Sequence, residues 1–95
     1  MSLTFEWDPR KAERNARKHG VSFEEASTCF GDPLSVMIPD PDRAEHEERF
    51  VLTGLSARGR LLVVVFMERG DRMRLVRARK ATPRERRTYE NAPPG

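Results

Sequence analysis

The sequence predicts a small α+β domain in which an antiparallel sheet carries helices on one face. Several short segments alternate apolar and polar residues with a period of two, which is typical of half-buried strands. Helix-capping signals precede three other segments. Short turns join the last four predicted strands, which favours an antiparallel meander. The predicted order is βααββββα, and 95 residues accommodate one domain over 1–95 without a second core.

The first strand and helix are predicted at the start of the chain. Leu3, Phe5 and Trp7 alternate with polar residues, which indicates a strand with one buried face. Asp8-Pro9 then supplies an N-cap and a first helical residue. The helix is predicted to run from Pro9 to Lys18, and Gly20 can adopt the left-handed conformation that ends a helix.

Two capping boxes predict the other helices. Ser22 is expected to cap a helix that reaches Phe30, with Glu25 reaching back to the cap. Thr82 and Glu85 form the second box, and the last helix is predicted to end near Asn91. Strands are expected at 34–38, 48–55, 60–67 and 72–79, of which 60–67 is apolar on both faces and therefore central in the sheet.

Positive charge is concentrated late in the chain. The formal net charge is +3, but residues 69–87 hold nine Lys or Arg against two acidic residues, a net charge of +7. Segregation of this kind indicates a surface for a phosphate backbone or an acidic partner. The simpler interpretation is a solvated charged face that aids solubility.

Several protein classes are excluded by composition. The single cysteine, Cys29, rules out an intramolecular disulfide and a cysteine-rich zinc site, so a reducing compartment, the cytoplasm, is expected. No stretch approaches the roughly 20 apolar residues that cross a bilayer. P-loop, dinucleotide-binding and HExxH motifs are absent, and the acidic loop Asp40–Glu48 lacks a clear magnesium spacing. Neither a metal nor a cofactor is expected.

The remaining polar residues suit the cleavage of RNA without a metal. RNA carries its own nucleophile, the 2′-hydroxyl, so a protein needs to align it, move protons and stabilise the charged phosphate. Arginine donates bidentate hydrogen bonds to phosphate oxygens. One predicted strand carries four arginines and is followed by Lys80: Arg72, Arg74, Arg77 and Arg79. Alternation puts the first two on one face and the last two on the other, unless a twist or bulge near Val76 intervenes, and which pair lines the open face stays undecided.

Proton-transfer groups and aromatic residues are few. His19 stands at a predicted helix C-terminus, where it either titrates near neutrality in catalysis or only hydrogen-bonds the last carbonyls. Glu48 beside Arg49 is either a carboxylate base next to a phosphate-binding arginine or a surface ion pair. Trp7 fits core packing better than base stacking, and the role of Tyr89 stays open.

Motifs along nearly the whole chain resemble those of the BrnT toxins, in the same order. The matching segments are Phe5–Asp8, Lys18–Ala26, Asp32-Pro33, Glu48–Phe50, Gly59–Val65, Arg77–Thr82, Glu85-Arg86 and Tyr89-Glu90. The resemblance implies a RelE-like fold and a metal-independent endoribonuclease toxin of a type II toxin–antitoxin pair. It also implies a BrnA-like ribbon-helix-helix antitoxin that neutralises the toxin, a complex that represses its own promoter and contacts DNA only through the antitoxin, and a toxin homodimer.

The resemblance also implies a set of site residues. The catalytic set is His19, Glu48, Arg49, Arg72, Arg79 and Lys80. Further RNA contacts are expected from Lys18, Arg58, Arg60, Arg74, Arg77 and Tyr89. Arg77 departs from the pattern, which has a small polar residue there. The alternative function is a non-catalytic, basic module that binds nucleic acid or an acidic protein.

Overall fold

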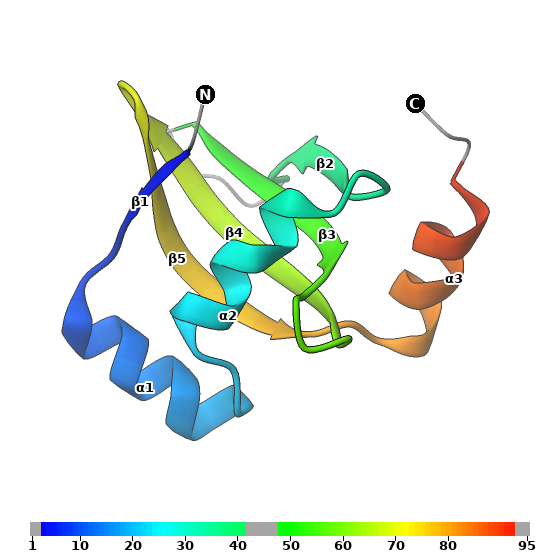
Figure 1. The fold of residues 1–95 in the computed structure, drawn as a ribbon, viewed down its shortest axis with the longest axis horizontal. Coiled ribbons are helices and arrows are strands. Elements are labelled where there is room, and N and C mark those ends of the chain that lie inside the picture. Colours follow the sequence, from blue (N-terminus) through cyan, green and yellow to red (C-terminus); the bar gives the residue numbers. More distant parts are fainter. Residues whose placement is uncertain (1–2, 42–47, 93–95) are drawn as a thin grey trace.

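The computed structural model describes residues 3–41 and 48–92 and shows a five-stranded sheet with three α-helices (Figure 1). Residues 42–47 of the predicted acidic loop, which include Asp42, Glu45 and Glu47, lie outside the described residues. The elements are β1 (Thr4–Glu6), α1 (Pro9–His19), α2 (Phe23–Thr28), the 3₁₀ turn η1 (Cys29–Gly31), β2 (Val36–Pro39), β3 (Arg49–Leu55), β4 (Leu61–Arg69), β5 (Arg72–Lys80) and α3 (Pro83–Asn91).

The sheet is mixed, so the prediction of an antiparallel sheet is only partly right. Its strand order is β1-β5-β4-β3-β2, and β2 to β5 form the expected antiparallel meander with β4 at the centre. β1, however, runs parallel to β5, with Thr4 opposite Arg72 and Glu6 opposite Arg74. The chain between β1 and β2 passes through two helices, which gives it the length to bring β1 to the outer edge of β5. This pairing protects backbone groups that the meander would leave exposed.

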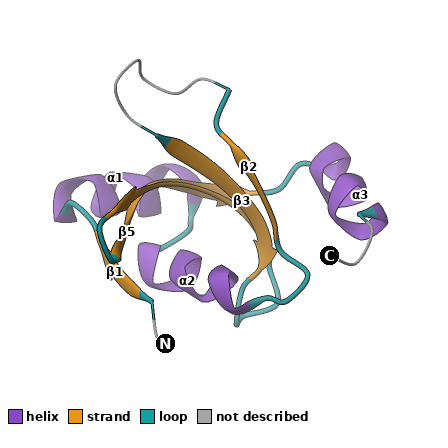
Figure 2. Ribbon diagram, turned by 90° about the horizontal axis from the view of Figure 1, so that it is seen from above, coloured by secondary structure: helices purple, strands orange, loops and turns teal. Residues whose placement is uncertain are grey.

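α2 lies against the concave face of the sheet and encloses the core, and α1 lies beside β5 (Figure 2). Val21, Phe23 and Ala26 are fully buried against apolar residues of β3, β4 and β5. α3 lies apart from α1 and α2, so the expectation that the helices share one face is wrong. The sequence of α3, PRERRTYEN, has no apolar stripe and no buried residue, so this helix has nothing with which to pack onto the core.

The predicted caps are confirmed except at Glu25. Asp8 accepts a hydrogen bond from the Arg10 backbone (2.8 Å), and Gly20 ends α1 with φ of 68°. Thr82 and Glu85 form the reciprocal capping box. Ser22 caps α2, but the Glu25 carboxylate binds Ser56 and Arg60 instead of reaching back to the cap. A hydrogen bond from a guanidinium is stronger than one from a neutral backbone amide, so the Glu25 carboxylate binds Arg60 and not the backbone of the cap.

An irregularity in β5 decides which arginines face outward. Val65 lies opposite Arg77 and Phe66 lies opposite Leu75, so Val76 is an extra residue in β5, a β-bulge. Leu75 and Ala78 are in the core on either side of the bulge. Since residues opposite each other share a face, four arginines lie on the side away from the core: Arg72, Arg74, Arg77 and Arg79. The question left open by strand alternation is thus answered, because both pairs line the open face.

Candidate functional site

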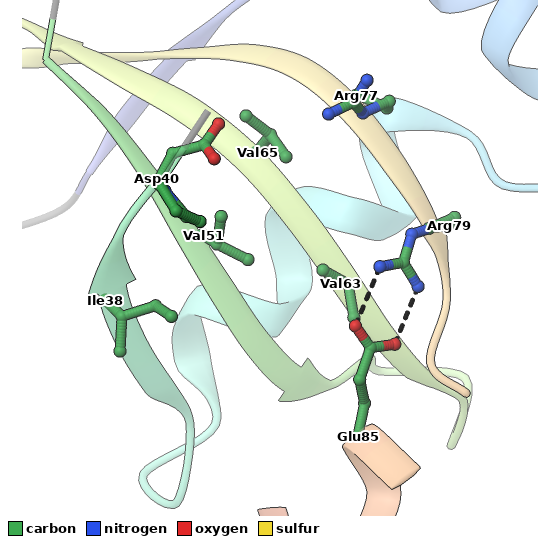
Figure 3. A pocket seen from close by; sticks show the side chains of 9 residues that line it. Ile38, Asp40, Val51, Val63, Val65, Arg77, Arg79 and Glu85 are labelled. Atoms are coloured by element: carbon green, nitrogen blue, oxygen red, sulfur yellow. Dashed lines mark hydrogen bonds and ion pairs between the residues drawn. The ribbon is translucent and has the colours of Figure 1, made fainter. Parts of the chain in front are cut away.

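The open face combines this row of arginines with an apolar floor. Arg77 lies opposite Val65, which lies opposite Val51, and Arg79 lies opposite Val63. A cleft of about 250 Å³ is formed between β5, β2 and the start of α3, lined by Ile38, Asp40, Pro41, Val51, Val63, Val65, Arg77, Arg79 and Glu85 (Figure 3). We call this the arginine cleft. Arg77 and Arg79 form one wall of the cleft, and Val51, Val63 and Val65 form its floor. This arrangement suits a phosphodiester whose phosphate contacts the arginines while its sugar or nucleobase lies on the valines.

Arg79 is held by a carboxylate from α3. Its two terminal nitrogens donate to the two carboxylate oxygens of Glu85, each at 2.8 Å, as the dashed lines of Figure 3 show. Arg79 also donates to the Lys80 carbonyl at 3.2 Å. The hydrogen bonds from Arg79 lower the pKa of Glu85 to about 2, so this carboxylate is ionised at neutral pH.

The other arginines of β5 differ in their partners. Arg74 and Arg72 both bind Glu6 of the neighbouring β1, at 2.9 and 3.4 Å, and the hydrogen bond from Arg74 is the main cause of the lowered pKa of Glu6. Arg77 is exposed and makes no ion pair with residues 3–41 or 48–92. Of this row, Arg77 therefore has the guanidinium most open to an incoming anion.

The structure brings some of the predicted catalytic residues together. Arg49 and Arg74 flank Met67 on the open face, two strand spacings or about 10 Å apart. Glu48 is exposed beside Arg49. Lys80 lies opposite the core residue Leu62, so it faces the helix side at the end of β5. The sheet therefore places Arg49, Arg72 and Arg79 on one surface and Lys80 on the other.

His19 and Lys18 lie in a separate groove between α1 and β5. That groove also contains Arg77, which lines the arginine cleft as well. His19 is half-buried at the C-terminal end of α1, as the sequence predicts. Arg77 thus links the two hollows around the edge of β5.

The structure assigns local structural contacts to Arg60 and Tyr89. Arg60 binds the buried carboxylate of Glu25 and the Gly20 carbonyl, and its hydrogen bonds lower the pKa of Glu25 to about 2. Arg58 is exposed 3.9 Å from the same carboxylate. The Tyr89 hydroxyl donates to Asp32 at 2.5 Å, which raises the pKa of Tyr89 to about 12. Both side chains therefore have structural partners within the protein, and their contact with RNA stays a prediction.

The interpretation of Trp7 as a packing residue agrees with its position, and Cys29 is also buried in the core. Trp7 packs edge-on against Phe23, with ring centroids 5.9 Å apart, beside the core. Burial raises the pKa of the Cys29 thiol to about 12, so the thiol stays protonated at neutral pH. In the described part of the chain, no helix has the length and apolar character to span a membrane.

Comparison with known proteins identifies the family. A family model described as "Ribonuclease toxin, BrnT, of type II toxin-antitoxin system" matches residues 7–85, most of the chain. The chain belongs to the BrnT family. The family resemblance drawn from the motifs is thereby confirmed. The matched segment of this BrnT-family chain includes all four arginines of the open face and ends at Glu85.

A solved structure shares the fold. The crystal structure of the Brucella abortus ribonuclease toxin BrnT is similar with a TM-score of 0.63 and 24% sequence identity, covering 85% of this chain and 99% of that one. This likeness shows a common fold with a BrnT toxin, while the RelE-like assignment stays a prediction. No protein among curated ones matches the chain.

Sequence reasoning about this BrnT-family chain missed four charged residues at or near the site. Glu6 and Glu85 pair with the arginines, and no sequence signal reveals those partners because both contacts depend on tertiary structure. Lys11 and Arg14 line the groove that holds Lys18 and His19. Their spacing did carry a signal, because residues 11, 14 and 18 fall on one face of a helix.

Proposed function

We propose that this chain is the toxin of a type II toxin–antitoxin pair and an endoribonuclease that cleaves RNA without a metal, through attack by the 2′-hydroxyl. The observation that supports this most is the bulge at Val76, which collects four arginines on one open face. Fixed guanidinium groups stabilise the extra negative charge that develops on the phosphate in the transition state. The family match supports the same reaction class.

The geometry favours different phosphates of the RNA strand for different arginines. Along an extended strand Arg72 and Arg79 are about 20 Å apart, which is too far for both side chains to bind one phosphate. We place the scissile phosphate between Arg77 and Arg79 in the arginine cleft, over Val63 and Val65. Arg72 and Arg74 then bind neighbouring phosphates of the strand.

Proton transfer is assigned to His19 or Glu48. His19 is the better-placed of the two, because it shares a groove with Arg77, whereas Glu48 adjoins Arg49 at the far end of the face. Lys80 follows Arg79 but faces the other side of the sheet, so it contacts the RNA backbone only where the strand passes around the end of β5. An imidazole can accept a proton in one step and return it in the next.

The partner is a BrnA-like antitoxin with a ribbon-helix-helix DNA-binding domain. An acidic or face-covering segment of that antitoxin blocks the arginine cleft, and the complex represses its own promoter, with DNA contacted through the antitoxin. The positive charge of the open face supports such a segment. The toxin acts in the cytoplasm and forms a homodimer, as the family resemblance implies.

A cleavage assay tests the proposal. The purified chain is incubated with a defined RNA in the presence of EDTA, and the new ends are mapped. We expect 2′,3′-cyclic phosphates, and we expect Arg79→Ala to lower the rate by about 100-fold or more. Arg17→Ala, which removes an equal charge from the exposed side of α1, is the control and should cut normally.

Two outcomes contradict the proposal. RNA that stays intact with folded, partner-free wild type overturns a free-standing nuclease. If Arg79→Ala instead lowers RNA affinity and its salt dependence together, without any cleavage to lose, the chain is a binding module.

A further inference from the structure

The groove between α1 and β5 is a second concentration of positive charge, and it has a volume of about 250 Å³. We call it the α1 groove. Its lining contains no carboxylate and consists of Lys11, Arg14, Asn15, Lys18, His19, Val76 and Arg77. Lys11, Arg14 and Lys18 are exposed and form no ion pair within residues 3–41 and 48–92.

The clustered cations of the α1 groove lower the stability of helix α1 when no anion is bound. Like charges three or four residues apart on a helix destabilise it by a few tenths of a kcal/mol per pair. The same helix does form an ion pair, between Glu13 and Arg17, but outside the α1 groove. The unpaired cations on the groove side therefore suit an anionic ligand.

The walls of the α1 groove are held in place by Asn15. Its side chain, in a residue that is 7% exposed, donates to the carbonyls of Val21 and Ala78 and accepts from the Ala78 backbone, at 2.9, 2.8 and 3.1 Å. β1 pairs only with residues 72–74 of β5, so the remaining edge of β5 lies against α1. The backbone of α1 and that of β5, the two walls of the groove, are therefore fixed relative to each other.

The α1 groove and the arginine cleft are separate hollows that share one lining residue, Arg77. Arg77 lines both, next to the bulged residue Val76, which lines the groove side. A strand of RNA whose scissile phosphate lies between Arg77 and Arg79 therefore meets more cations as it passes around the edge of β5. This shared residue favours RNA over an acidic protein segment, because one extended polyanion can contact both hollows.

We propose that the α1 groove is a second RNA subsite, which binds the sugar–phosphate backbone next to the scissile position through Lys11 and Arg14, with Lys18 beside them. The proposal rests on the proposed function for the location of the cut. Contacts between cations and phosphates carry no sequence information, so the subsite adds affinity for longer RNA and not sequence preference.

The test compares two double variants of α1 that remove equal charge. The groove variant, Lys11→Ala/Arg14→Ala, removes two cations from the lining of the α1 groove. The control variant, Arg10→Ala/Arg17→Ala, removes two exposed arginines that do not line it. Binding is measured by fluorescence anisotropy with 2′-O-methyl RNA, which lacks the nucleophile, as a trinucleotide and as a strand of about 12 nucleotides. Thermal melts followed by circular dichroism show that each variant is folded.

We expect the groove variant to lose about tenfold in affinity for the longer RNA, with a salt slope smaller by about 1.4, since each phosphate contact on single strands contributes about 0.7. Its affinity for the trinucleotide, and both affinities of the control variant, should change less than about twofold. Equal losses in the two variants would show a general charge effect and overturn the subsite.

Two further outcomes separate this subsite from the alternatives. If oligoglutamate binding, and not RNA binding, depends on Lys11 and Arg14, the groove takes an acidic protein and the proposal is wrong. If wild type fails to cleave RNA while the groove variant alone loses affinity for the longer strand, the nuclease proposal fails and the RNA subsite stands.

Discussion

The Glu85 carboxylate accepts hydrogen bonds from the Thr82 backbone and from both terminal nitrogens of Arg79. A carboxylate and a phosphate present similar pairs of oxygens to a guanidinium. Glu85 therefore occupies the position on Arg79 that a phosphate group of RNA would take. RNA entering the arginine cleft competes with this carboxylate.

Removal of that competition should strengthen RNA binding. We expect Glu85→Gln to bind 2′-O-methyl RNA about three- to tenfold more tightly, because a neutral amide holds Arg79 less strongly and still offers an oxygen to the helix cap. Glu90→Gln, the same change at an exposed position of α3, is the matched control. Weaker binding by Glu85→Gln would mean that Glu85 positions Arg79 for phosphate instead of competing with it.

Glu25 makes stability depend on pH. Its pKa is about 2 in the folded protein, because of Arg60 and Ser56, and about 4.3 in the unfolded chain. The stabilisation, about 3 kcal/mol, is complete above the unfolded pKa and is lost as pH falls towards the folded pKa. Urea unfolding at about pH 6 and about pH 3 should differ by roughly 1.7 kcal/mol from this residue, because the loss is a little over half complete at about pH 3, and Glu25→Gln should reduce the difference. Glu24→Gln, at the exposed neighbour, should keep the full pH dependence.

At the scale of elements, Asn15 joins α1 to β5 and to the chain that follows α1. Asn15→Ala leaves three backbone groups without their partner, those of Val21 and Ala78. We expect a loss of about 2–4 kcal/mol in the free energy of unfolding, measured with urea. Asn91→Ala, at the exposed end of α3, should cost less than about 0.5 kcal/mol. A similar small cost for Asn15→Ala would show that water replaces its hydrogen bonds.

The helices were predictable because their signals are local. Asp8-Pro9 and Thr82 to Glu85 specify their caps within four residues, and the structure has those caps. Glu25 had the same local signal but a different outcome, because Arg60 lies 35 positions later in the chain. Local patterns cannot show a distant competitor for a side chain.

The site was less predictable than the helices for a related reason. The arginines of β5 and a bulge near Val76 could be read from the sequence, but the side they face depends on register with β4. Glu6 meets Arg74 only because β1 runs parallel to β5, and the two residues are 68 positions apart. Contacts between residues so far apart in the chain produce no periodic pattern in a single sequence from which they could be predicted.

At the scale of the whole molecule, the open face predicts strong salt dependence of RNA binding. Four arginines that each neutralise a phosphate of a single strand give a slope of about −3 in log affinity against log salt. Between about 0.05 M and about 0.2 M salt, the affinity should fall about 50-fold. Anisotropy titrations measure this slope. A slope near zero would show that base stacking on the apolar floor, and not phosphate contact, provides the affinity.

The parallel pairing of β1 with β5 also has a consequence for synthesis. β1 is made early, yet its partner strand follows 68 positions later, a delay of several seconds at roughly 5–20 residues per second. Until then the sheet lacks its edge, and the arginine face does not exist. The row of arginines on the open face therefore forms only after β5 has left the ribosome, late in synthesis.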